Sequence, residues 1–141
     1  EALSRGARVS FFVENNAKAV QFIRENLSFT HLEKDAVVMQ KSVLSAIHEL
    51  SLKQIRFDLV YMDPPYQKGF EEETLRALAY SSIIDTDTMI IIEADKNNTL
   101  SFLKDMPFEV FREKLYKTNK HVFVRLGGIK HEEKSDLSGN V

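Results

Sequence analysis

The chain has 141 residues, of which 43% are hydrophobic, and this is enough for one domain with a buried core. It contains no cysteine, which excludes disulfides and any mechanism that uses a thiolate, including cysteine-dependent methylation of a pyrimidine carbon. No apolar run is long enough to span a bilayer and no signal-peptide pattern opens the chain, so we expect a soluble cytoplasmic protein with no membrane partner.

Predicted strands and helices alternate through most of the chain, as the hydrophobic spacing indicates. In order they are a strand at 9–13, a helix from Asn15 or Asn16 to about Leu27, a strand at 36–39, a helix at 42–50, a strand at 57–62, a helix at 71–80 and a strand at 89–92. The strand at 89–92 is so apolar that we expect it to be buried on both faces. This alternation predicts parallel crossovers and a doubly wound α/β sheet.

The C-terminal part predicts a different connection. Two extended stretches at 108–117 and 120–126 are separated by Thr118 and Asn119, which is typical of a hairpin. An antiparallel hairpin is permitted at the edge of an otherwise parallel sheet. We therefore predict one domain at 1–126, followed by a mobile charged tail at 127–141.

A short motif directly follows the predicted strand at 57–62: Asp63, Pro64, Pro65 and Tyr66. Proline cannot donate to a β-ladder and restricts the residue before it, so the prolines end the strand and hold the motif on a stiff turn. Open α/β sheets bind ligands at the carboxyl ends of their strands. The motif therefore predicts a site with one hydrogen-bond acceptor and one ring, although Asp-Pro pairs are also common in simple turns.

Several segments together resemble the RsmD-type methyltransferases: 1–7, 12–15, 24–27 and 57–66. The resemblance extends to about Leu126. That family uses S-adenosyl-L-methionine to methylate the exocyclic N2 amine of a guanine in bacterial small-subunit ribosomal RNA. The resemblance implies a Rossmann-like class I methyltransferase fold, and it implies ribosomal RNA or an assembling small ribosomal subunit as the partner.

The resemblance also implies an N-terminal truncation. In the family, residues 1–7 correspond to the second half of the first helix, and Gly6 lies where the C-terminal glycine of a helix belongs. The first strand and a glycine-rich cofactor loop precede that helix in the family, and neither is in this sequence. We expect a fragment whose missing part is supplied by another chain or another copy. A frayed terminus of a complete domain is the alternative.

Three further residues are candidates for binding the cofactor together with Asp63. Glu14 ends the predicted strand at 9–13 and can accept two hydrogen bonds from a ribose diol, as an acid does in dinucleotide-binding folds. A glutamate at a strand end is otherwise more often a solvated surface charge. Asn15 can add a contact to the nucleoside. Ser42 stands where the family usually has an acid beside the adenine, and it is either that contact or only the N-cap of its helix.

Asp63 and its turn are expected to perform the transfer. The exocyclic amine of a base is a poor nucleophile because its lone pair is delocalised into the ring. If the Asp63 carboxylate and the Pro64 carbonyl accept the two N–H bonds, the lone pair turns toward the sulfonium methyl group. Tyr66 would stack on the unstacked base, and Pro65 would form part of the pocket wall.

The motif leaves two alternatives open. DNA adenine-N6 methyltransferases share it, and the activation of an amine does not distinguish guanine from adenine. The second alternative belongs to another class: an inactive fragment or interaction module that cannot bind the cofactor alone.

Binding of RNA must rest on a local basic patch or on a part of the protein absent here, because the formal net charge is −2. The predicted hairpin gathers basic residues with Tyr116 and Phe123 between them: Arg112, Lys114, Lys117, Lys120 and Arg125. Such charge more often only protects a sheet edge. The four histidines have no metal-ligand spacing, so we predict no metal site.

Overall fold

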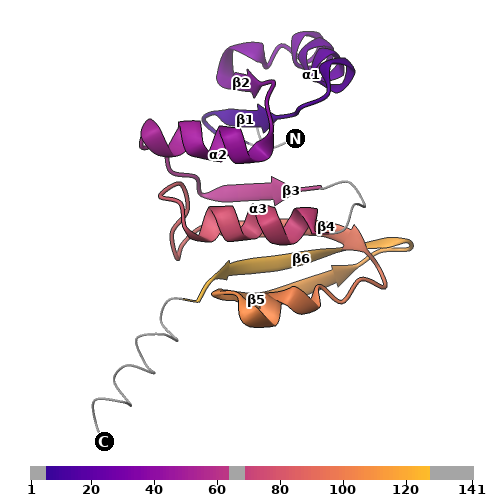
Figure 1. Ribbon diagram of the computed structural model, residues 1–141. Helices are drawn as coiled ribbons and strands as arrows, with labels where there is room; N and C mark the ends of the chain where they lie inside the picture. The colour runs from indigo at the N-terminus through magenta and orange to yellow at the C-terminus, as the bar shows by residue number, and fades with distance from the viewer. Residues whose placement is uncertain (1–5, 64–68, 128–141) are drawn as a thin grey trace, which may run out of the picture. The chain divides into compact units, whose positions relative to one another are not determined.

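Figure 1 shows the computed structural model, which describes residues 6–63 and 69–127. These residues belong to two compact units, one ending at Leu50 and the other beginning at Ser51. Apart from Gly127, the predicted mobile tail lies outside the described residues, as do residues 1–5.

The first unit contains a two-stranded parallel sheet and its crossover helix. Strand β1 (Ser10–Val13) pairs with β2 (Ala36–Met39) from Ser10 against Ala36 to Val13 against Met39. Between them lie helix α1 (Ala17–Phe29) and the short 3-10 helix η2 (Glu33–Asp35), and helix α2 (Val43–Leu52) follows β2. This is the connection that parallel strands require, and it confirms the predicted crossover.

Local hydrogen bonds determine where α1 begins. The side chain of Asn16 accepts the backbone N–H groups of Lys18 and Ala19 at 2.9 and 3.1 Å. Of the two predicted caps, Asn15 and Asn16, the second is therefore the N-cap. The buried residues of the helix are Val20 and Leu27, which are seven positions apart and so lie on one side of it.

The second unit is a mixed four-stranded sheet with strand order β3-β4-β6-β5 (Figure 1). It contains β3 (Leu59–Met62), helix α3 (Phe70–Ala79), β4 (Met89–Asp95), the 3-10 helix η3 (Ser101–Asp105), β5 (Phe108–Leu115) and β6 (Asn119–Leu126). Strands β3 and β4 are parallel, whereas β6 is antiparallel to both of its neighbours. The predicted C-terminal hairpin is confirmed.

Strand β4 alternates between a buried and a partly exposed face. Ile90, Ile92 and Ala94 are at most 5% exposed, whereas Ile91 and Glu93 are only half-buried. The expectation that this strand is buried on both faces was therefore wrong. Successive side chains of a strand point to opposite faces, and the face that carries Ile91 and Glu93 is only partly covered by the described residues.

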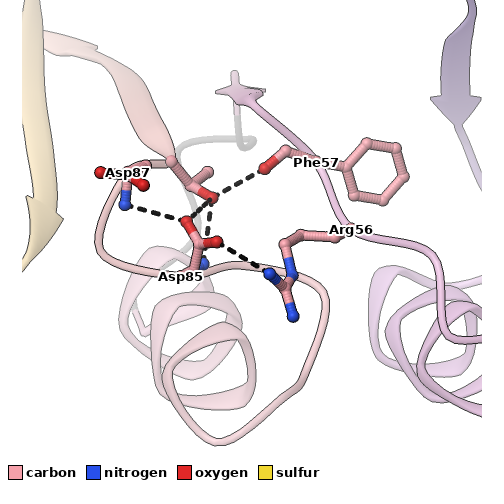
Figure 2. Close-up of polar contacts among 5 residues, drawn as sticks. Arg56, Phe57, Asp85 and Asp87 are labelled. Carbon is pink, nitrogen blue, oxygen red and sulfur yellow. Dashed lines mark hydrogen bonds and ion pairs between the residues drawn. The ribbon is translucent and has the colours of Figure 1, made fainter.

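The side chains of Arg56, Asp85 and Thr88 connect the starts of β3 and β4, and we call this group the clamp. The Thr88 hydroxyl donates to the Phe57 carbonyl at 2.7 Å and accepts the Asp85 N–H at 3.0 Å. The Asp85 carboxylate accepts the Asp87 N–H at 2.9 Å and forms an ion pair with Arg56 at 3.2 Å (Figure 2). Thr88 is only 1% exposed, so these bonds are shielded from water on its side.

The register of β3 and β4 decides which residues meet at the carboxyl ends of the two strands. The pairing begins with Leu59 against Met89, next to this clamp, and ends with Met62 against Ile92. The next residue is Asp63 after β3 and Glu93 within β4. This register therefore brings two carboxylates to neighbouring positions.

Candidate active site

Asp63 lies at the carboxyl end of β3, where the motif predicted a site. Its pKa is raised, first because it is partly desolvated and second because the negative charge of Glu93 is close; His121 opposes this shift. Asp63 is nevertheless exposed, so its carboxylate is accessible to a ligand and can accept an N–H bond. Asp63 is thus suited to bind the amino group of a ligand. Pro64, Pro65 and Tyr66 lie outside the described residues.

Glu93 and three neighbouring side chains form what we call the Glu93 cluster: Tyr61, Glu93, Tyr116 and His121. The Tyr61 hydroxyl donates to the Glu93 carboxylate, and His121 Nε2 lies 3.4 Å from both Glu93 Oε1 and the Tyr61 hydroxyl. On the other side of the imidazole, the Tyr116 hydroxyl lies 3.4 Å from Nδ1. The His121 ring contacts the Tyr61 and Tyr116 rings edge-on, with centroids 5.7 and 4.8 Å apart. Two tyrosines therefore hold the imidazole beside Glu93.

These contacts keep Glu93 ionised. Its pKa is lowered mainly by the hydrogen bond from Tyr61, with smaller contributions from Asn119 and His121, and desolvation opposes the shift. Conversely, desolvation and the same hydrogen bond raise the pKa of Tyr61, so its hydroxyl stays protonated. Glu93 is thus a fixed negative charge next to Asp63.

The Glu93 cluster was not predicted from the sequence. Part of the signal was available, since Glu93 follows an apolar strand just as Asp63 does, but the predicted strand ended at Ile92. His121 and Tyr116 reach the site only through the long-range pairing of β4 with β6, in which Glu93 lies opposite His121.

The other predicted cofactor residues lie at the carboxyl edge of the β1-β2 sheet, in the first unit. Glu14 follows β1; its carboxylate accepts the Asn16 N–H at 2.9 Å, and its own N–H donates to the Met39 carbonyl at 3.0 Å. Asn15 is exposed. The Ser42 hydroxyl accepts the Ser45 N–H at 3.2 Å, which is the N-cap role. A cofactor contact by these three residues stays a prediction.

One of the basic residues that the sequence gathers on the hairpin is buried. Lys120 is 7% exposed and its Nζ lies 3.4 Å from Glu113, so it is not part of an exposed patch. Its position on β6 puts it on the buried face together with Val122. Three other cations lie over aromatic rings of the hairpin: Arg112 over Phe123, Lys114 over Tyr116 and Arg125 over Phe111.

Residues 6–63 and 69–127 contain neither a candidate metal site nor a candidate membrane-spanning helix. No three acidic or histidine side chains there come together in a way that could hold a metal ion. No helix within these ranges has both the length and the apolar character needed to cross a membrane.

Residues 1–125 match the model of a protein family described as "Conserved hypothetical protein 95". The chain belongs to this family. The match includes the Asp63 motif and the whole Glu93 cluster, and it confirms the RsmD-type resemblance inferred from the sequence.

Relatives and solved structures agree with the family. The chain is 27% identical over 101 residues to "Ribosomal RNA small subunit methyltransferase D" of Haemophilus influenzae, an alignment that covers 71% of this chain and 52% of that protein. The solved structure of a conserved hypothetical protein from Streptococcus pyogenes superposes with a TM-score of 0.77 and 31% identity, covering 89% of this chain and 76% of the other. The chain thus spans about half the length of the Haemophilus relative.

A more distant structure supports the fold alone. The ribosomal protein L11 methylase of Lactobacillus delbrueckii subsp. bulgaricus has a TM-score of 0.70 at 14% identity, over 89% of this chain and 61% of that one. Together with the parallel pairs and the antiparallel hairpin, this similarity confirms that the chain has the Rossmann-like methyltransferase fold.

Proposed function

We propose that the chain is part of an enzyme that uses S-adenosyl-L-methionine to methylate the N2 amine of a guanine in small-subunit ribosomal RNA. The observation that supports this most is the position of Asp63, partly desolvated at the carboxyl end of a parallel strand and followed by Pro64, Pro65 and Tyr66. The name of the Haemophilus relative supports ribosomal RNA as the substrate.

The cofactor would supply a methyl group activated by its positive sulfur. The acceptors at the edge of the β1-β2 sheet suit its nucleoside: Glu14 would bind the ribose diol, with Asn15 and Ser42 beside it. These groups can accept hydrogen bonds, which is what hydroxyl and amino groups of a nucleoside require.

Asp63 would act on the acceptor. Its carboxylate accepts one N–H of the guanine amine and the Pro64 carbonyl accepts the other, which directs the nitrogen lone pair toward the methyl group. One C–N bond forms while the C–S bond breaks, S-adenosylhomocysteine leaves, and the methylated amine gives up one proton to Asp63 or to water. The barrier falls through orientation and electrostatic stabilisation, without a covalent intermediate on the enzyme.

Methyl transfer by the full-length protein tests this proposal. Labelled methyl groups should pass to unmodified small-subunit ribosomal RNA and not to DNA, and digestion of the RNA should yield N2-methylguanosine. Asp63→Asn should reduce kcat by about 10²–10³-fold, because it removes a charged acceptor from the transition state. Asp58→Asn, at the other end of the same strand, is the matched control and should retain activity. Near-normal turnover by Asp63→Asn would refute the role of Asp63.

Binding of S-adenosylhomocysteine tests the cofactor residues separately. Glu14→Gln should weaken binding about 10–100-fold in calorimetric titration, since a hydrogen bond to a charged group contributes about 1.5–3 kcal/mol. An affinity unchanged by this substitution would remove Glu14 from the site. If the wild-type protein does not bind the ligand at all, the alternative of an inactive interaction module is favoured.

A further inference from the structure

The proposed methyl-acceptor site contains two neighbouring carboxylates rather than one. Met62 and Ile92 are the last paired residues of β3 and β4, and Asp63 and Glu93 follow them directly. The backbones of adjacent strands lie about 4.8 Å apart. Side chains at neighbouring positions can therefore both contact one small planar ligand.

Glu93 is held in place and still has capacity to accept. The Tyr61 hydroxyl donates to it, and His121 and Asn119 contribute hydrogen bonds. An ionised carboxylate has about four acceptor sites, so these neighbours leave at least one free. Glu93 also remains partly exposed, with 26% of its side chain accessible. A ligand bound at Asp63 can thus reach it.

Guanine and adenine differ in what they present to a pair of carboxylates. On guanine, the N1–H donor is adjacent to the N2 amine, so this edge is a row of donors. On adenine, the N6 amine is adjacent to N1, which is an acceptor. A negative oxygen facing that lone pair is repelled, and a ring nitrogen left without a donor stays unsatisfied. Two carboxylates therefore match guanine and oppose adenine.

We propose that Glu93 is a specificity-determining residue that accepts the guanine N1–H while Asp63 accepts from the N2 amine. Tyr61 and His121 keep Glu93 oriented for this contact. The inference rests on the proposed function and goes further, because it explains how one pocket selects guanine although the Asp63 motif activates either amine.

2-Aminopurine is the probe, because it retains the C2 amine of guanine but has a lone pair at N1 instead of N1–H. It also lacks O6, so the decisive quantity is how the preference for guanine changes in a Glu93 variant. The acceptor is the shortest ribosomal RNA fragment methylated by the wild-type protein, synthesised with guanine or 2-aminopurine at the methylated position. The wild-type protein should prefer guanine by about 10–100-fold in kcat/KM, the value of one charge-assisted hydrogen bond.

The variant Glu93→Gln should shrink this preference to less than about threefold. It loses activity on guanine, whereas the new amide can donate to N1 of 2-aminopurine and retain activity there. Glu113→Gln makes the same change on β5, where Glu113 pairs with Lys120, and should leave the preference at its wild-type value. A role of Glu93 in folding alone would lower both rates equally.

The outcomes distinguish a failure of the inference about Glu93 from a failure of the proposed function. If Glu93→Gln keeps the wild-type preference while Asp63→Asn is inactive, the inference about Glu93 is wrong and the proposed function stands. If the wild-type protein methylates no guanine in any ribosomal RNA, both fail together.

Discussion

Replacing Thr88 with valine tests whether the clamp between the starts of β3 and β4 holds the site together. Thr88 is 1% exposed, and its hydroxyl donates to the Phe57 carbonyl at 2.7 Å and accepts the Asp85 N–H at 3.0 Å. Valine has almost the same shape and replaces the hydroxyl with a methyl group, which cannot form hydrogen bonds. The substitution therefore leaves a carbonyl and an N–H without this partner but creates no cavity.

The expected loss follows from these two bonds. Leaving a buried polar group without its partner costs about 1–3 kcal/mol. Two groups lose their partner here, but solvent can reach the surrounding turn and partly replace it. We therefore expect Thr88→Val to lower the free energy of unfolding by about 2–3 kcal/mol in total. Arg56→Ala is the control within the same clamp. It removes an ion pair whose arginine side chain is 66% exposed, so its effect should be much smaller.

Urea denaturation of the three proteins under identical conditions measures the difference. Thr88→Val should lower the midpoint without changing the slope, which indicates an altered stability rather than an altered unfolded state. Hydrogen exchange should also quicken at the Met89 amide, which donates to the Asp58 carbonyl at 3.0 Å next to the clamp. The reasoning is refuted if Thr88→Val is no more destabilising than Arg56→Ala.

Three further predictions concern stability and can be checked by the same denaturation measurements. Tyr61→Phe should destabilise the protein more at pH 7 than at pH 3. The depressed pKa of Glu93 stabilises the fold fully above the unfolded pKa of about 4.3, and this contribution is lost as pH falls through the folded pKa; an equal loss at both values would contradict it. Ile92→Ala, at a position 0% exposed, should cost about 2–5 kcal/mol, whereas Leu59→Ala, at 43% exposure, should cost far less; similar losses would refute the assigned core. Gly69→Ala should cost about 1–2 kcal/mol from backbone strain alone, because Gly69 has φ +83° and an added Cβ meets nothing within 4 Å; an unchanged midpoint would count against strain there.

Short-range signals allowed much of this fold to be predicted from the sequence. The order of strands and helices depends on hydrophobic spacing within ten or so residues, and both parallel crossovers and the hairpin were confirmed. Asp63 was placed at a strand end because two prolines follow it, and proline imposes its restriction locally. Roles for Glu14, Asn15 and Ser42 in binding the cofactor stay predictions.

Contacts between distant strands could not be predicted in this way. Lys120 was grouped with the basic residues of an exposed hairpin, but the register of β6 places it on the buried face, where Glu113 pairs with it. Glu93 was not singled out from the sequence. Only the pairing of β4 with β6 brings His121 opposite to it, and such pairings depend on the packing of the whole sheet.

The sequence by itself determined the family, the succession of elements and the place of Asp63 at the end of a strand, because these depend on neighbours along the chain. The tertiary structure alone decided that a second carboxylate, held by Tyr61 and His121, lies close to Asp63. The physical reason is that the parallel register of β3 and β4 aligns residues 30 positions apart, and no pattern within a short stretch of sequence indicates that alignment.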